Sequence, residues 1–110
     1  MAGVNSGSHA EITVSEGSPG CLTVKLSGEL DILSVDRLNG QIEKLLASSA
    51  EKVALDLSDL TFMDSSGIGM LLRLTNQFGP SDVHGASALI RRVISVTGLT
   101  DILRLGDATL

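Results

Sequence analysis

Apolar and polar residues alternate in two short stretches near the start of the chain. Residues 11–14 and residues 22–26 both follow this period of two, which is typical of half-buried strands. Between them, residues 17–20 read Gly-Ser-Pro-Gly, a composition that favours turns. The pattern therefore predicts an antiparallel hairpin. Residues 1–10 carry neither a basic start nor an apolar run, so we expect a flexible tail and no secretory signal.

A helical spacing follows the hairpin. Apolar residues recur three and four positions apart, at Val35, Leu38, Ile42, Leu45 and Leu46. Ser34 precedes this run and is a suitable N-cap, so we expect the helix to begin there. Gly40 lies inside the run and lowers its helix propensity by about 1 kcal/mol.

Short strands and helices alternate in the second half of the chain. Residues 53–57 are rich in Val and Leu, which predicts a central strand covered on both faces. Residues 68–78 are apolar almost all round, which predicts a helix packed over most of its circumference. Residues 83–86 form a weak strand at best. A further helix is expected between Ser87, as its N-cap, and Gly98, just past its end.

The order of these elements predicts an α/β layer structure with a parallel or mixed sheet. Residues 99–105 fit either a last strand or a helical turn. With 110 residues and a hydrophobic fraction of 43%, the chain is long enough for one domain around one core.

Composition excludes several classes of protein. Cys21 is the only cysteine, so an intrachain disulfide is impossible, no zinc-ligand spacing exists, and the cytoplasm is the expected compartment. The net charge of −5 and an aromatic set of only Phe62 and Phe78 argue against direct nucleic-acid binding. The longest apolar window, residues 68–74, is about a third of a bilayer span, so we expect no membrane insertion.

The segment that carries candidate chemistry is Asp-Ser-Ser-Gly at residues 64–67. The N-terminus of a helix has unpaired N–H groups and a partial positive charge. Either Asp64 or Ser65 can cap it, and Gly67 and Gly69 let another molecule approach the first turn. A hydroxyl there is well placed for phosphorylation, with the phosphate oxygens near the N–H donors of that turn. The same four residues are also an ordinary way to start a helix.

Three segments together resemble the STAS family, and within it the stand-alone anti-sigma-factor antagonists of bacteria. They are Gly-Glu-Leu-Asp at residues 28–31, the run from Leu57 to Leu72, and the run from Ile90 to Leu99. The resemblance extends from about residue 11 to residue 105. It implies a STAS fold, with a mixed sheet of four to five strands and helices packed on one side. Residues 11–110 would then form a single STAS domain after the tail.

The resemblance also implies a function. In such antagonists the serine directly after the Asp of the motif is phosphorylated, which here is Ser65, with Ser66 as a secondary acceptor. The unmodified antagonist binds an anti-sigma factor that is a Ser/Thr kinase and so releases the sigma factor. Phosphorylation ends the binding, and a PP2C-type phosphatase reverses it. The expected partner-binding residues are Asp31, Asp64, Ser65, Ser66, Gly67 and Gly69.

Under this hypothesis the chain is a kinase substrate and no enzyme, and it needs neither a cofactor nor a metal. Ser65 has no neighbouring His or Lys in the sequence that could act as a base. An alternative is a non-switching STAS scaffold in a signalling or transport complex, in which Ser65 is only a cap. A small hydrolase or nucleotide-binding enzyme is disfavoured because no Gly-x-x-x-x-Gly-Lys loop is present, although weak nucleotide binding stays open to titration.

One segment departs from the family pattern. Residues 81–86 replace what is usually a firm apolar run. We therefore expect a short, poorly packed edge strand, which leaves self-association by strand pairing open.

Overall fold

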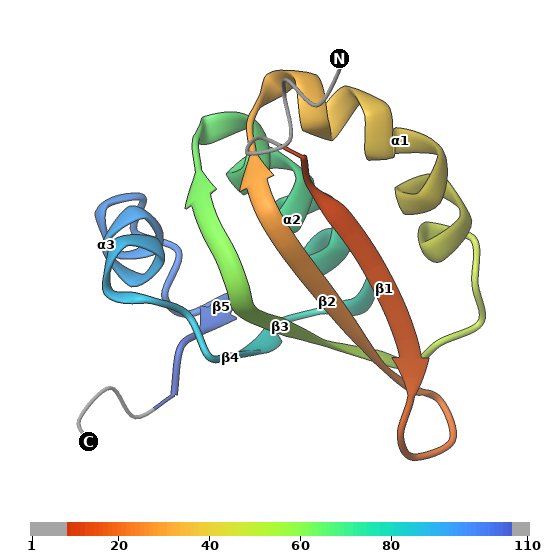
Figure 1. Ribbon diagram of the computed structural model, residues 1–110. Helices are drawn as coiled ribbons and strands as arrows, with labels where there is room; N and C mark the ends of the chain where they lie inside the picture. Colours follow the sequence, from red (N-terminus) through yellow and green to blue (C-terminus); the bar gives the residue numbers. More distant parts are fainter. Residues whose placement is uncertain (1–8, 107–110) are drawn as a thin grey trace.

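A computed structural model describes residues 9–106 and contains a five-stranded sheet with three helices (Figure 1). In chain order the elements are β1 (Glu11–Glu16), β2 (Cys21–Leu30), α1 (Ile32–Leu46), β3 (Lys52–Met63), α2 (Ser65–Phe78), β4 (Ser81–His84), α3 (Ala88–Val96) and β5 (Leu103–Arg104). The strand order is β1-β2-β3-β4-β5. Only the β1–β2 pair is antiparallel, so the sheet is mixed, as predicted.

The predicted hairpin is confirmed. In its register Val14 lies opposite Val24, and the turn between the strands is closed by a 2.9 Å hydrogen bond from the backbone N–H of Cys21 to the carbonyl of Ser18. Of the predicted tail, residues 1–8 lie outside the described residues. His9 is exposed, whereas Ala10 is buried.

The strand β3 is central, as predicted, but coverage on both faces was the wrong expectation. Val53, Leu55 and Leu57 are buried, whereas Ala54 and Asp56 between them remain partly exposed. The alternation places the apolar side chains on one face only. On that face α1 and α2 lie side by side, and α2 packs against β3. The third helix, α3, also packs against β3 and lies at the opposite side of the molecule from α1 (Figure 1).

The first helix begins earlier than the apolar spacing predicts. Its N-cap is Asp31, whose carboxylate accepts a 2.9 Å hydrogen bond from the backbone N–H of Ser34. Ser34 is therefore a buried residue of the first turn and not the cap. Asp31 takes this role because it is the last residue with extended backbone, so its side chain faces the unpaired N–H groups. Both predicted ends of α3 are confirmed, with Ser87 as N-cap and Gly98 at a φ of 77° just past the helix.

The short strand β4 is interior, which corrects the expectation of a poorly packed edge. It pairs with β3 at Val83 and with β5 at Ser81, and both residues are buried. The edge on this side of the sheet is instead the two-residue β5, where Arg104 forms a 2.8 Å ion pair with Asp82. A hydrogen bond from Arg104 lowers the pKa of Asp82 below its ordinary value.

The core is one continuous cluster between the sheet and the helices. Its largest fully buried side chains are Leu26, Leu30, Leu38, Ile42, Leu55, Leu57, Leu60, Met63, Met70, Leu71, Leu74 and Ile90. Among the helices of residues 9–106, none has both the length and the apolar character that a bilayer span requires.

Candidate functional site

Two helix N-termini meet at one end of the sheet. Because β2 and β3 are parallel, their C-terminal ends lie at the same edge, and α1 and α2 begin directly after them. The backbone N–H of Asp64 donates a 3.1 Å hydrogen bond to the carbonyl of Leu30, which links the two strand ends. The caps Asp31 and Asp64 are therefore on neighbouring connections, which brings these two predicted site residues together.

Asp64 caps the serine turn. It is extended, and its Oδ1 accepts hydrogen bonds from the N–H groups of Ser66 at 2.8 Å and of Gly67 at 3.4 Å. Ser65 is the first helical residue and is exposed, whereas Ser66 is half-buried. Within residues 9–106 the Ser65 hydroxyl forms no hydrogen bond. The Asp64 carboxylate thus uses two donors of the first turn and leaves the Ser65 hydroxyl accessible.

Asp31 is held in its charged form. Ser34 donates hydrogen bonds to the Asp31 carboxylate from its backbone N–H and from its side chain, and these bonds lower the pKa of Asp31 below its ordinary value. A carboxylate that accepts such bonds favours ionisation. Asp31 therefore places a fixed negative charge at the start of α1.

The glycines of the motif have different roles. A Cβ on Gly67 would lie 2.5 Å from Cγ of Met63 and 3.0 Å from Cβ of Leu30, so the first turn of α2 approaches the sheet too closely for a side chain. Gly69 has no atom within 4 Å of such a Cβ. Gly28 has a φ of 84°, and a Cβ there would lie 2.0 Å from the carbonyl oxygen of His9. Gly28 and Gly67 are thus required by the fold, whereas Gly69 is open to solvent.

A groove of about 400 Å³ runs between α1 and α2 from the serine turn. It is lined by Ile32, Val35, Asp36, Asn39, Ser66, Gly69, Met70 and Arg73. Among these residues Ile32 is 68% exposed, and its chain neighbour Leu33 is 78% exposed. The sequence pattern missed both residues because it placed the helix start at Ser34. The sequence did contain a signal for them, because Ile32 and Leu33 are two adjacent apolar residues directly after Asp31, which can cap a helix.

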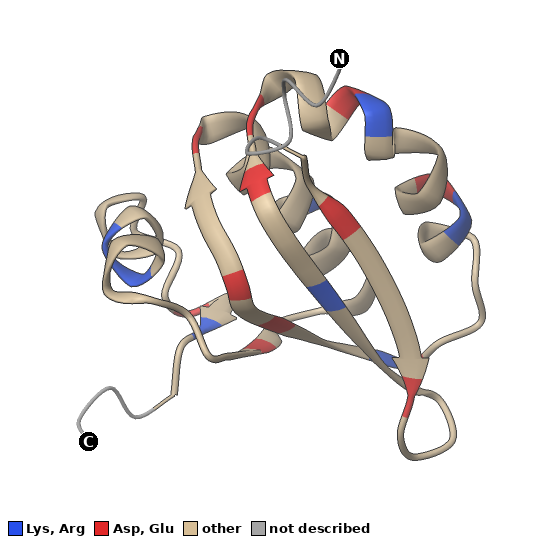
Figure 2. Ribbon diagram, viewed as in Figure 1, with Lys and Arg blue, Asp and Glu red and all other residues tan. Residues whose placement is uncertain are grey.

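Charge around this end of the sheet is mainly acidic. Figure 2 shows acidic positions where β2 and β3 end and again at the start of α1. They are Glu29, Asp31, Asp36 and Asp64. Of the nearby cations, Arg37 donates a 2.7 Å hydrogen bond to the carbonyl of Ala10, and Arg73 contacts Asn39 and Glu43.

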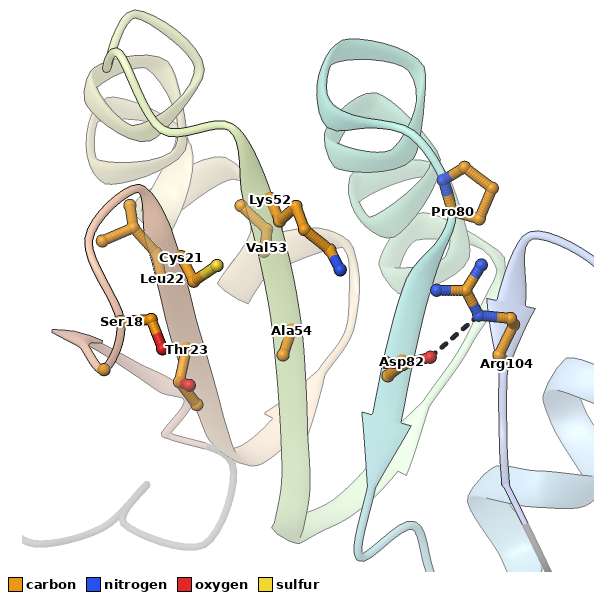
Figure 3. Close-up of a pocket in the computed structure, with 11 residues that line it drawn as sticks. Ser18, Cys21, Leu22, Thr23, Lys52, Val53, Ala54, Pro80, Asp82 and Arg104 are labelled. Carbon is orange, nitrogen blue, oxygen red and sulfur yellow. Dashed lines mark hydrogen bonds and ion pairs between the residues drawn. The ribbon is translucent and has the colours of Figure 1, made fainter.

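A second hollow, of about 290 Å³, lies on the open face of the sheet (Figure 3). It is lined by residues near the start of β2 and β3, among them Cys21 and Lys52, and by the Asp82–Arg104 pair. Because Ser65 follows the other end of β3, this hollow is separate from the serine turn. No group of acidic, His and Cys side chains suited to a metal is found in residues 9–106.

The fold and this site define a small α/β domain that presents an exposed serine on a capped helix N-terminus, beside a groove between two helices. A family model described as "Mlab, STAS domain" matches residues 14–105. The chain belongs to the STAS-domain family, as the three sequence segments predict.

Its relatives carry consistent names. An "Anti-sigma-B factor antagonist" of Staphylococcus epidermidis is 28% identical over 90 residues, which cover 78% of this chain and 83% of that protein. The crystal structure of an anti-sigma factor antagonist from Mycobacterium paratuberculosis superimposes with a TM-score of 0.77 at 26% identity, over 94% of this chain and 89% of that one. The phosphorylated form of the Bacillus cell fate determinant SpoIIAA matches with a TM-score of 0.63 at 26% identity, over 90% and 92% of the two chains.

Proposed function

We propose that the chain is an anti-sigma-factor antagonist regulated by phosphorylation of Ser65, with Ser66 as the secondary acceptor. Unmodified, it binds an anti-sigma factor that is a Ser/Thr kinase, and the sigma factor is released. Once the kinase phosphorylates Ser65, the complex dissociates, and a PP2C-type phosphatase restores the unmodified form. The chain acts in the bacterial cytoplasm as a binding protein and kinase substrate, without catalysis of its own.

The observation that carries this proposal is the position of Ser65. It is the exposed first residue of α2, and its hydroxyl makes no hydrogen bond within residues 9–106. A kinase needs an accessible hydroxyl, and Ser66 is the poorer acceptor because it is half-buried. The relatives named as anti-sigma factor antagonists support the role of antagonist, and the existence of a phosphorylated form of SpoIIAA supports regulation by phosphorylation.

The electrostatics of the turn favour release after modification. A phosphate adds about 1.5 to 2 negative charges at neutral pH. The N–H groups of Ser66 and Gly67 are already bound by Asp64, so the phosphate gains them only by displacing that carboxylate. Its charge therefore adds to those of Asp31 and Asp64 on the same surface. Like charges at a docking surface lower the affinity for the partner. This repulsion is sufficient for release, so the chain does not need to refold.

The first test is phosphorylation in vitro. The chain is incubated with ATP and each purified Ser/Thr-kinase-type anti-sigma factor of the source organism, and the modified residue is located by mass spectrometry. We expect the Ser65→Ala variant to abolish incorporation and the matched Ser66→Ala variant to retain most of it. Incorporation that survives in Ser65→Ala would contradict the assignment.

The second test measures binding by calorimetry. We expect the phospho-Ser65 protein to bind the anti-sigma factor at least about tenfold more weakly than the unmodified protein. Equal affinities would refute the electrostatic switch. If Ser65→Ala and Ser65→Asp baits instead recover the same non-kinase protein or transport complex from the host, the chain is a non-switching STAS scaffold.

A further inference from the structure

The outer edge of β1 is unpaired. β2 occupies one side of this strand, and within residues 9–106 no strand occupies the other, so β1 lies at the margin of the sheet (Figure 1). We infer that this edge pairs with β1 of a second copy of the chain, so that two five-stranded sheets join into one. β1 contains no residue of the serine turn, so this inference does not rest on the proposed function.

The hydrogen bonding of the hairpin determines which backbone groups of β1 face outward. Alternate residues of an antiparallel pair bond to the neighbouring strand, and the residues between them direct their N–H and C=O groups away from it. The backbone N–H of Gly17 donates a 3.2 Å hydrogen bond to the carbonyl of Cys21, which continues the register of β1 with β2. Every second residue back from Gly17 therefore bonds to β2. The outward groups belong to the residues between them, Ile12, Val14 and Glu16.

Arg37 supports this assignment at the preceding outward position. Ala10 comes two residues before Ile12, so its carbonyl also faces outward. Arg37, on α1, donates a 2.7 Å hydrogen bond to that carbonyl. The edge is thus closed at Ala10, whereas the three outward residues of β1 have no such partner within residues 9–106.

β1 lacks the devices that commonly protect an edge strand. Natural edges carry Lys, Pro or a β-bulge. The sequence of β1, Glu-Ile-Thr-Val-Ser-Glu, contains neither Lys nor Pro, and its register with β2 has no bulge. Val14 is 45% exposed at this edge and lines a hollow of about 340 Å³ beside α1, so a paired strand would cover it. The other residues that line this hollow are Leu22, Gln41, Lys44, Leu45 and Ser48.

One register uses all three outward residues. It places a two-fold axis at Val14, so that Val14 faces Val14 of the second copy and Ile12 faces Glu16. Each of these facing pairs exchanges two hydrogen bonds, about six in total. Thr13 then lies opposite Ser15, and two hydroxyls that face each other across strands stabilise the pair.

The charges are compatible with this register. Glu11 lies opposite Gly17 of the second copy, and Glu16 lies opposite Ile12, so no glutamate faces another. Glu16 shares the α1 side of the sheet with Ile12. Its carboxylate therefore lies near the start of β1 in the second copy, where Arg37 supplies the opposite charge. The net charge of −5 repels a second copy only weakly, because charges more than about 8 Å apart are screened at physiological ionic strength.

The experiment measures the mass of the chain by sedimentation velocity over a series of concentrations. It compares the wild type with Val14→Pro and with the matched control Val14→Thr. Proline removes the outward N–H of residue 14 from both copies, and an edge strand tolerates proline where the N–H faces solvent. Threonine keeps both the N–H and the β-branched shape.

We expect the wild type and Val14→Thr to dimerise. Val14→Pro should raise the dimer dissociation constant at least about tenfold, as for the loss of two hydrogen bonds. Urea denaturation checks that each variant folds. If Val14→Pro does not fold, Val14→Lys is used, since it places two like charges opposite each other, and the same loss is expected.

Disulfide cross-linking tests the register. Thr13→Cys and Ser15→Cys are each made in a Cys21→Ser background. Facing residues of a pair that is not hydrogen-bonded have Cα atoms about 4.5 Å apart, which a disulfide can span. Under mild oxidation, a mixture of the two variants should form a covalent dimer, whereas each variant alone should not.

A wild-type chain that stays monomeric at every concentration up to its solubility limit would overturn the inference, as would a dimer that persists in folded Val14→Pro. If the wild type is a monomer and Val14→Pro weakens its binding to the anti-sigma factor, the edge pairs with that partner and not with a second copy. Covalent dimers from either cysteine variant alone, and none from the mixture, would refute the register.

Discussion

Gly67→Ala tests how closely α2 approaches the sheet. The added Cβ would lie 2.5 Å from Cγ of Met63 and 3.0 Å from Cβ of Leu30. Met63 is 2% exposed and Leu30 is fully buried, so neither can move into solvent. The helix start must shift away from the strand ends, or the core beneath it must rearrange.

The magnitude follows from two opposing effects. Overpacking of a tight core costs about 1–3 kcal/mol. Replacement of a helical glycine by alanine offsets this by about 0.5–1 kcal/mol. The free energy of unfolding should therefore fall by about 1–2 kcal/mol. Gly69→Ala is the matched control, because its Cβ meets no atom within 4 Å, and it should raise the stability by about 0.5–1 kcal/mol.

Urea denaturation, followed by far-UV circular dichroism, measures both variants. The two midpoints should lie on opposite sides of the wild-type value and about 1 M apart. A Gly67→Ala midpoint at or above that of the wild type would refute the close approach of α2. A loss of stability in Gly69→Ala would refute the open environment assigned to that residue.

Two further predictions concern the central strand and the cap of α1. Leu55→Ala removes a fully buried side chain from β3 and should lower the unfolding free energy by about 2–5 kcal/mol, measured by urea titration. Asp31→Asn retains an N-cap side chain but removes a carboxylate whose pKa is lowered in the folded state. That lowered pKa stabilises the fold above the unfolded value of about 3.9, and the contribution is lost as pH falls through the folded value. Thermal denaturation from pH 7 to pH 3 should therefore show a smaller loss of stability for Asp31→Asn than for the wild type, and identical losses would contradict the cap assignment.

Elements with local signals could be predicted from the sequence. The hairpin has its turn residues between two alternating stretches, and Ser87 and Gly98 mark the ends of α3. The run of Val and Leu correctly predicted the central position of β3 but wrongly predicted coverage on both of its faces. The signals for the hairpin and for α3 lie within a few residues of the structure they specify, so tertiary contacts do not override them.

Features that depend on tertiary contacts could not be predicted in this way. Asp31 and Ser34 both have side chains that can cap a helix. The end of β2 determines that Asp31 is the cap of α1, because the extended backbone continues to that residue. The interior position of β4 comes from its pairing with the distant β5. Asp31 and the serine turn were predicted as site residues, but the cap role of Asp31 was not, and the groove beside them exists only where α1 and α2 meet. Whether those residues bind a partner stays a prediction.

The hydrogen bond between Asp64 N–H and Leu30 C=O has an evolutionary consequence. It joins the two strand ends through the main chain, so this link does not depend on which side chains the neighbouring surface carries. Exposed positions such as Ile32 and Leu33 can therefore mutate with little effect on folding. After gene duplication, copies of such a domain can diverge in the partner they select while each remains equally stable, which allows parallel signalling pathways to separate within one cell.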